Sequence, residues 1–229
     1  MTYQKITIPL DHGNRNMKTA EEVFTSGLVE SDLKPVLGEY LQYNGKYYSL
    51  TGERIPYMRD KTLDDRFFIL TLFGIGKELE RRTQPQKDTI YQVELPVGLP
   101  PKHYGALFEK FGQYFVRPGV QRFTFNKREY LVQITKAAVF PQDYAAAMTI
   151  YPQTYNRVVT VDIGGFTLDY LLLREGRPDL SVCDSLEKGV ITLYNRIISR
   201  VSSDFDMLLE DTDIDTIILG KNSDYSDSV

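Results

Sequence analysis

The sequence predicts a mixed α/β protein, and three of its features indicate this class. Apolar residues alternate in the manner of a strand at residues 6–10, whereas residues 61–82 are apolar on almost every side, as in a long buried helix. The third feature is a repeat, in which two strand–turn–strand units of similar sequence stand about 150 residues apart. A chain of 229 residues is long enough for one or two domains with a sizeable core.

Composition narrows the classes of function before any motif is considered. Lys and Arg number 27 against 31 Asp and Glu, a formal net charge of −4, so direct binding of nucleic acid is not expected. No apolar stretch approaches the ~20 residues of a membrane span, and the first residues lack the pattern of a signal peptide. The single cysteine, Cys183, excludes a disulfide framework and fits a reducing cytoplasm. We therefore expect a cytoplasmic protein without a membrane partner.

The elements of the first 150 residues are expected in a definite order. A strand through residues 6–10 enters a polar turn at 11–16, and a second strand-like stretch follows at 17–24. Asn44-Gly45 predicts a hairpin between two strands, because both residues accept positive φ. The remaining elements are a helix at 61–82, a strand at 88–95 stopped by Pro96, a helix at 103–111 opened by Pro100-Pro101, strands at 123–125 and 129–140, and a helix at 144–148 with Pro141 in its first turn.

The pattern of strands begins again after a polar stretch near residues 151–156. A near-continuous apolar strand at 157–162, the tight turn Gly164-Gly165 and a returning strand at 168–173 form its first part. A turn at 176–178, a short strand-like run at 180–183, a helix at 186–201 and an apolar run at 214–219 follow. We expect two units, residues 1–152 and residues 153–229.

The repeated strand–turn–strand unit contains the residues that suggest a binding site. Residues 10–18 (the first hairpin) and 161–169 (the second hairpin) both read apolar-Asp-x-Gly-x-x-[Asn/Thr]-apolar-charged. An Asp at a strand end is suited to hold a hydrated Mg²⁺, and the Gly two places later lets backbone N–H groups approach an anion. A tight hairpin without any ligand is the alternative for a single copy, whereas two copies favour a polyphosphate site.

The two hairpins resemble two motifs of a known family. LDHGNRNMK and VDIGGFTLDY, with VFPQDYAA between them, look like phosphate-1, phosphate-2 and the connecting helix of the actin superfamily. SLEKGVITLYNRI resembles the segment after phosphate-2, and the match is closest to plasmid-segregation actins of the ParM/StbA type. The resemblance implies an actin-like fold, with two RNase H-like lobes around a cleft that binds ATP or GTP and Mg²⁺. It also implies filaments that move plasmid DNA through a DNA-binding adaptor protein.

The same resemblance assigns roles to ten residues. Asp11 and Asp162 would face the Mg²⁺ shell, and Gln142 would orient the water that attacks the terminal phosphate. The cofactor-binding residues implied for the two hairpins are Gly13, Asn14, Asn16 and Lys18 on one side, and Gly164, Gly165 and Thr167 on the other. His12 is expected to be a polar neighbour of the first hairpin rather than a catalyst.

The sequence departs from the family in one respect, and it leaves two alternative functions open. No Gly-Gly-Gly segment follows Gly165, whereas family members place such a segment on the adenosine, so we expect an incomplete second lobe and a shortened form of the protein. One alternative function is a small-molecule kinase-like phosphotransferase on the same fold. The other is a non-catalytic binding module in which the hairpins serve as a scaffold.

Overall fold

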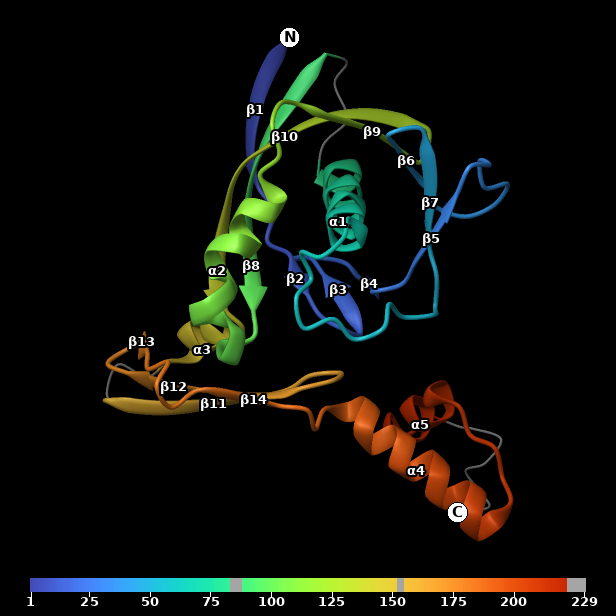
Figure 1. The fold of residues 1–229 in the computed structure, drawn as a ribbon, viewed down its shortest axis with the longest axis vertical. Coiled ribbons are helices and arrows are strands. Elements are labelled where there is room, and N and C mark those ends of the chain that lie inside the picture. The colour runs from blue at the N-terminus through green and yellow to red at the C-terminus, as the bar shows by residue number, and fades with distance from the viewer. Residues whose placement is uncertain (83–87, 152–154, 222–229) are drawn as a thin grey trace.

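The computed structural model describes residues 1–82, 88–151 and 155–221 (Figure 1). In this part of the chain, a curved sheet of seven strands wraps around helix α1 (Arg66–Arg82), and a smaller sheet lies across the open side (Figure 1). A further sheet and a pair of helices follow toward the C-terminus. None of the helices in the described ranges has both the length and the apolar character needed to cross a membrane.

The curved sheet combines a parallel half with an antiparallel half. Its strands follow the order β1 (Thr2–Thr7), β8 (Thr89–Leu99), β10 (Arg128–Pro141), β9 (Gln121–Phe125), β6 (Leu41–Tyr43), β7 (Lys46–Leu50) and β5 (Leu28–Ser31). β1, β8 and β10 are parallel, and all other neighbours are antiparallel. The expected Asn44-Gly45 hairpin is confirmed between β6 and β7, and both turn residues have positive φ, 50° and 80°.

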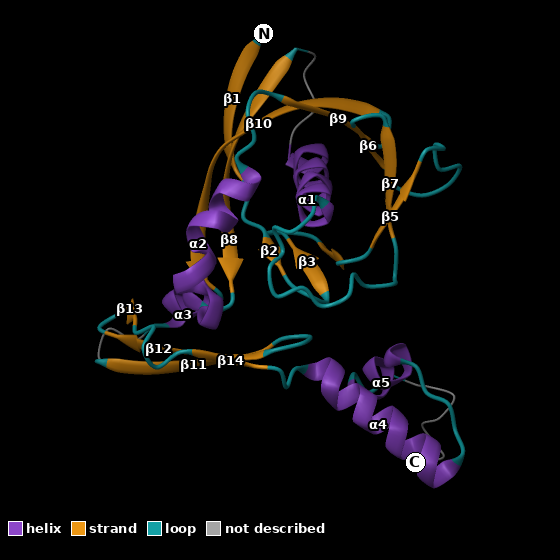
Figure 2. Ribbon diagram, in the orientation of Figure 1, coloured by secondary structure: helices purple, strands orange, loops and turns teal. Residues whose placement is uncertain are grey.

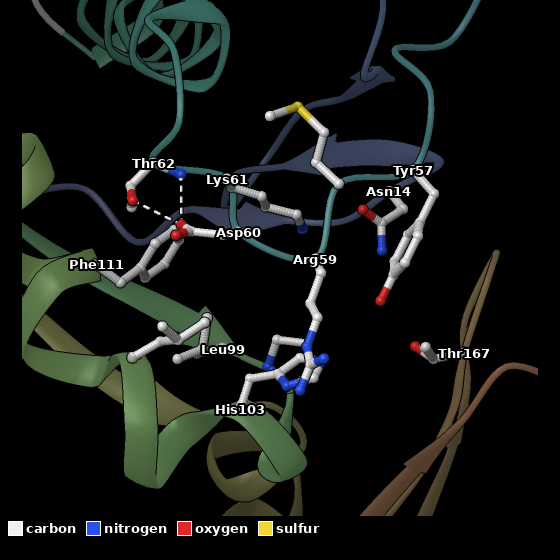
Figure 3. A pocket seen from close by; sticks show the side chains of 13 residues that line it. Asn14, Tyr57, Arg59, Asp60, Lys61, Thr62, Leu99, His103, Phe111 and Thr167 are labelled. Carbon is white, nitrogen blue, oxygen red and sulfur yellow. Dashed lines mark hydrogen bonds between the residues drawn. The ribbon is translucent and has the colours of Figure 1, made fainter.

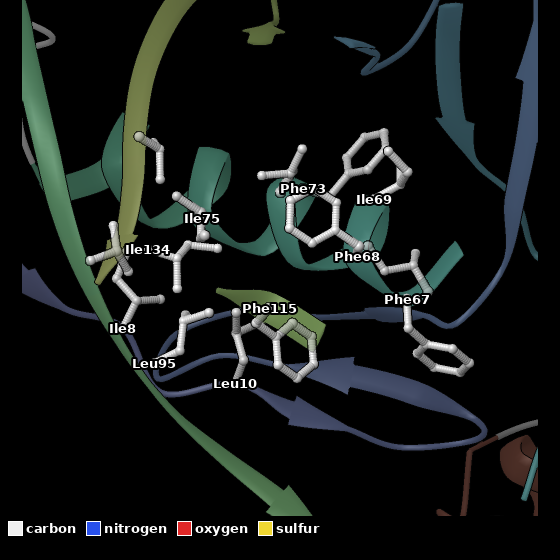
Figure 4. Packing of buried hydrophobic residues seen from close by; sticks show 14 of the residues in the cluster. Ile8, Leu10, Phe67, Phe68, Ile69, Phe73, Ile75, Leu95, Phe115 and Ile134 are labelled. Atoms are coloured by element: carbon white, nitrogen blue, oxygen red, sulfur yellow. The ribbon is translucent and has the colours of Figure 1, made fainter. Parts of the chain in front are cut away.

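Helix α1 is the centre of the main core. Twelve of its 17 residues are buried, as expected for a helix enclosed by a sheet on several sides. Phe73 is fully buried among the core side chains around α1 (Figure 4). Its ring meets that of Phe125 of β9 edge to face, with ring centroids 5.9 Å apart. Gly76 permits this approach, because a Cβ there would lie 2.8 Å from the Phe125 ring. The helix therefore fixes the curvature of the sheet around it.

The small sheet and two further helices complete the first half of the chain. β2 (Asp11–His12), β3 (Asn16–Lys18) and β4 (Val23–Thr25) form the small sheet. Helix α2 (Pro101–Phe115) packs on β10 and begins with Pro101, as the double proline predicts (Figure 2). Helix α3 (Tyr144–Ile150) follows the end of β10.

The second half of the chain is built on a separate, smaller core. β11 (Arg157–Ile163), β12 (Leu168–Arg174), β13 (Arg177–Pro178) and β14 (Asp184–Leu186) form a four-stranded sheet. Leu171 and Leu173 of β12 bury against Ala147 of α3. Helices α4 (Val190–Phe205) and α5 (Asp211–Ile218) extend away from the sheets (Figure 1). The division that we expected between residues 152 and 153 falls outside the described residues and stays a prediction.

The expectation that Pro96 stops a strand is wrong, because β8 continues through it to Leu99. The Pro96 carbonyl accepts a hydrogen bond from the Leu10 amide at 2.9 Å. Because the nitrogen and carbonyl of one strand residue face the same side, the missing N–H faces the irregular segment after β1 rather than β10. The proline therefore costs the ladder with β10 no hydrogen bond.

Other boundaries differ from expectation for local reasons. Helix α1 begins at Arg66 rather than residue 61, and just before it the Asp64 carboxylate accepts the Arg66 amide at 3.0 Å in a local turn. Pro141 is the last residue of β10, opposite Leu99, and is not in the first turn of α3. The stretch 17–24 is divided by a turn into β3 and β4. No strand covers residues 180–183, and α4 begins at Val190.

Phe73→Ala tests how much the core around α1 contributes to the stability of the fold. Removing a fully buried ring leaves a cavity, so the free energy of unfolding should fall by about 3–5 kcal/mol in urea denaturation. Leu63→Ala, at a side chain that is 70% exposed just before the same helix, should change it by less than about 0.5 kcal/mol. Equal losses in both variants would contradict the central place of α1.

Candidate functional site

The first hairpin is attached to one face of helix α1. His12 Nε2 lies 2.8 Å from Thr71 Oγ1, and the Thr19 hydroxyl donates to the buried Glu78 carboxylate. Between these contacts Leu10 packs on Gly74, where a Cβ would lie 2.6 Å from the leucine side chain. Positions 71, 74 and 78 share a helix face, since side chains three and four residues apart are neighbours. The helix therefore fixes where the hairpin begins.

His12 has the structural role that the sequence predicts. Its ring is fully buried and lies 4.8 Å from the Phe115 ring and 5.6 Å from the Phe111 ring, centroid to centroid. Burial and the nearby Lys61 charge lower the pKa of this imidazole to about 3. The ring is thus neutral at pH 7 and lies under the hairpin, away from the open cleft.

The second hairpin joins β11 to β12 and receives the start of helix α4. Its turn is closed by a hydrogen bond from the Gly164 amide to the Thr167 carbonyl, 2.8 Å long. The amides of Val190 and Ile191 donate to the carbonyls of Gly164 and Gly165, at 3.0 and 2.8 Å. These bonds satisfy amides of the first helical turn, which would otherwise have no partner within the helix. The hairpin and the helix are one continuous hydrogen-bonded unit.

All ten residues that the sequence singled out line one cleft of about 220 Å³ between the two hairpins. They come from β2, β3, β11 and the turns that follow β2, β10 and β11. Their positions in the chain are up to 156 residues apart, from Asp11 to Thr167, so the fold brings them together. The juxtaposition of the two hairpins is the main feature of the site.

Asp11 and Gln142 meet at one end of the cleft. Gln142 Nε2 donates to Asp11 Oδ1 at 2.9 Å, and Lys18 Nζ lies 3.6 Å from Asp11 Oδ2. The backbone amide of Gln142 donates to the Leu99 carbonyl at 2.9 Å, which continues the hydrogen bonds between β10 and β8 beyond Pro141. Gly98 makes room for this pair, since a Cβ there would lie 3.0 Å from Gln142 Cγ. Gly98 belongs to no motif that the sequence reasoning used.

The hairpin tips touch one another across the cleft. A Cβ on Gly165 would lie 2.6 Å from Arg15 Cβ, so the glycine is needed for the two turns to approach. Arg15 pairs with Asp215 of α5 at 2.6 Å. Close by, the Tyr57 and Phe166 rings stack at 3.9 Å between centroids, with 17° between their planes. These contacts hold the two halves of the chain together around the cleft.

Three carboxylates, those of Asp143, Asp162 and Asp169, lie near the second hairpin, and none of them forms an ion pair within the described residues. Burial, followed by the neighbouring Asp162 charge, raises the pKa of Asp143, and burial also raises the pKa of Asp169. Asp143 Oδ2 and Asp169 Oδ1 are buried and have no hydrogen-bond partner in the described part of the chain. Such crowding of negative charge favours a cation. Asp11 and Asp162 thus fit a hydrated Mg²⁺ held through its waters.

The described side chains do not form a set of direct ligands that would enclose a metal ion. Within residues 1–82, 88–151 and 155–221, no three His, Cys, Asp or Glu side chains are grouped closely enough to hold a metal ion. At phosphate sites Mg²⁺ usually keeps several waters and is bound through one or two carboxylates together with the phosphates, a mode of binding that does not require such a group.

The sequence reasoning missed two charged residues of the cleft. Lys61, from the loop between β7 and α1, lines the cleft, and its side chain points toward Asn14 in the adjoining pocket that Figure 3 draws. Asp169, 2% exposed, accepts the Thr167 hydroxyl at 2.9 Å. Asp169 is the charged residue at the end of the second hairpin motif, and it pairs with Asp162 across the two strands, which places it near the cleft. Lys61 has no motif around it that indicates a site.

No protein-family model and no curated protein matches this sequence, but solved structures match its fold. The archaeal actin homologue Ta0583 superposes with a TM-score of 0.72 at 16% identity, over 89% of this chain and 68% of that chain. The chain has the actin fold. The apo psk41 ParM protein shares this fold with a TM-score of 0.67 at 16% identity, over 94% of this chain and 78% of that one.

A third match to the actin fold is the AlfA filament bound to AMPPNP. Its TM-score is 0.61 at 19% identity, and the match covers 89% of this chain and 78% of that chain. The resemblance that the two hairpins indicated is therefore confirmed for the fold. The partial coverage of these longer chains agrees with the expected incomplete second lobe.

Gly189→Ala tests the union of the second hairpin with α4. A Cβ at this position would lie 2.5–2.6 Å from backbone atoms of residues 164–166, which have no flexible end to move aside. Unfolding free energy should fall by about 1–3 kcal/mol, measured by thermal or urea denaturation. Gly105→Ala, in open space inside α2, should leave stability unchanged or raise it by up to about 1 kcal/mol. Similar effects of both changes would refute the packing argument.

His12 should make stability depend on pH in a defined direction. Its folded pKa of about 3 lies below the ordinary value of 6.5, so between these values the unfolded chain takes up a proton that the folded chain does not. Stability from this group is complete above pH 6.5 and is lost as the pH falls toward 3. In urea denaturation, His12→Gln should therefore show a smaller loss between pH 6.5 and pH 4 than the wild type. Parallel pH profiles would contradict the assignment.

Proposed function

We propose that this chain is an actin-like protein of the ParM type that binds and hydrolyses ATP with Mg²⁺ and assembles into filaments. The observation that carries the proposal is the meeting of both hairpins and Gln142 around one cleft. A polyphosphate requires donors on two sides and few steric obstacles, and the glycine-rich turns with their Asn and Lys neighbours supply both.

The residues of the cleft divide the work of phosphoryl transfer. The asparagine side chains and Lys18 would hold the outer phosphates from the first hairpin, and the turn from Gly164 to Thr167 would hold them from the second. Asp11 and Asp162 would hold Mg²⁺ through its waters, and the bound ion would neutralise phosphate charge. Gln142, fixed by its hydrogen bond to Asp11, would orient the attacking water. An amide suffices because this reaction depends mainly on positioning and charge stabilisation.

Filament formation is supported by the fold and by the surface. Matches to the actin fold include AlfA and Alp12, both solved as filaments, and Ta0583 in complex with ADP. In this chain β11 is an edge strand whose Val159, Val161 and Ile163 are about 60% exposed. An exposed apolar edge strand favours association with another surface. We propose a second copy of the chain as that surface.

The cellular role that we propose is segregation of plasmid DNA from a cytoplasmic location. The chain carries a net charge of −4, so we propose that DNA is engaged by a basic adaptor protein rather than by the filament itself. The phosphotransferase and the non-catalytic scaffold that the sequence left open predict different assays. The first transfers phosphate to a small hydroxyl compound, and the second binds no nucleotide.

Asp162→Ala is the test of the proposed chemistry. Loss of a carboxylate that faces the Mg²⁺ shell should abolish Mg-dependent ATP hydrolysis and nucleotide-dependent light scattering while circular dichroism stays unchanged. Titration calorimetry with Mg-ATP and Mg-ADP, beside Asp11→Ala, measures binding separately from assembly. Asp32→Ala, at an exposed carboxylate remote from the cleft, serves as the matched control. Unchanged hydrolysis in Asp162→Ala would overturn the assignment.

A further inference from the structure

Lys61 is a buried cation on the wall of the cleft. The residue is only 6% exposed, yet it lines the space between the two hairpins. Its ammonium donates to the His12 carbonyl and lies 5.0 Å from the centre of the Phe67 ring. Figure 3 shows the side chain reaching from its loop toward Asn14.

The ammonium of Lys61 has no carboxylate in contact. Within the described residues no Asp or Glu oxygen lies within 4 Å of it, and the His12 carbonyl is its one hydrogen-bond acceptor. Burial lowers its pKa to about 8, and the more distant charges of Asp11 and Asp169 oppose this shift. A buried ion without a counter-ion is costly to a fold. The cost is reduced if an anion occupies the cleft.

The position of Lys61 indicates which part of an anion it meets. The Lys61 ammonium contacts the carbonyl of His12, which is the residue after Asp11. The Asp11 carboxylate accepts a hydrogen bond from the Gln142 side chain. Lys61 therefore lies in the cleft that Gln142 and both hairpins line, where the proposed function places the outer phosphates. An ammonium has three donors, and the contact with His12 uses one of them, so two remain for ligand oxygens.

We propose that Lys61 is a ligand-binding residue whose ammonium contacts the terminal phosphate of a bound nucleoside triphosphate. This inference rests on the proposed function, because it names a further contact of the same cleft. Lys61 differs from Lys18, whose side chain is 56% exposed and already lies beside Asp11. A buried ammonium is fixed in place before the ligand arrives and loses little conformational freedom on binding.

The test compares triphosphate with diphosphate binding. In titration calorimetry with Mg²⁺, Lys61→Met should weaken binding of the non-hydrolysable analogue AMPPNP by about 10-fold to 100-fold. Binding of ADP, which lacks the terminal phosphate, should change by less than about 3-fold. Lys46→Met, at a partly exposed lysine that pairs with Glu30 and Asp32 away from the cleft, is the matched control and should alter neither affinity.

The outcomes separate this inference from the proposed function. If the wild type binds AMPPNP but Lys61→Met binds both nucleotides as the wild type does, or loses both equally, the contact with the terminal phosphate is refuted and the function stands. If the wild type binds neither nucleotide, the proposed function fails and this inference fails with it. Folding is checked by melting temperature, since an apolar residue of similar volume is usually tolerated in place of a buried charge. Lys61→Gln, which keeps a donor for His12, must show the same selective loss.

Discussion

The attachment of the first hairpin to helix α1 is the constraint on which the rest of the site depends. The helix is enclosed by the curved sheet, so it cannot shift without disturbing the main core. Polar contacts at Thr71 and Glu78 then hold the hairpin along a single helix face. Between them Leu10 packs closely on Gly74, which has no side chain. This anchoring fixes the position of Asp11. The Asp11 carboxylate in turn accepts a hydrogen bond from the Gln142 side chain and so fixes that side chain as well.

The two walls of the cleft are supported in different ways. The first hairpin rests on the large core, whereas the second belongs to a sheet whose buried cluster, among the described residues, is made of Leu171, Leu173 and Ala147 of α3. The second wall is held instead by backbone hydrogen bonds to α4 and by contacts between the hairpin tips. Small cores contribute little stability of their own, so this wall is the more easily displaced of the two.

Sequence reasoning succeeded where local chemistry decides structure. The Asn44-Gly45 turn, the buried helix and the two Asp-x-Gly hairpins all follow from backbone preference and periodicity, and the shared cleft followed from the repeat. It failed where neighbours decide. Whether Pro96 ends a strand depends on which side of it another strand lies, and Lys61 reaches the cleft only because its loop passes beneath the first hairpin. Neither fact is encoded by the adjacent residues.

The hydrogen bonds from α4 to the second hairpin have a mechanical consequence. The amides of residues 189–191 donate to carbonyls of the turn, so a change in the turn's orientation must tilt the helix with it. A helix of 16 residues is about 24 Å long, so a tilt of about 5° displaces its far end by about 2 Å. The helix would therefore carry a small reorientation of the turn to its far end, well away from the cleft.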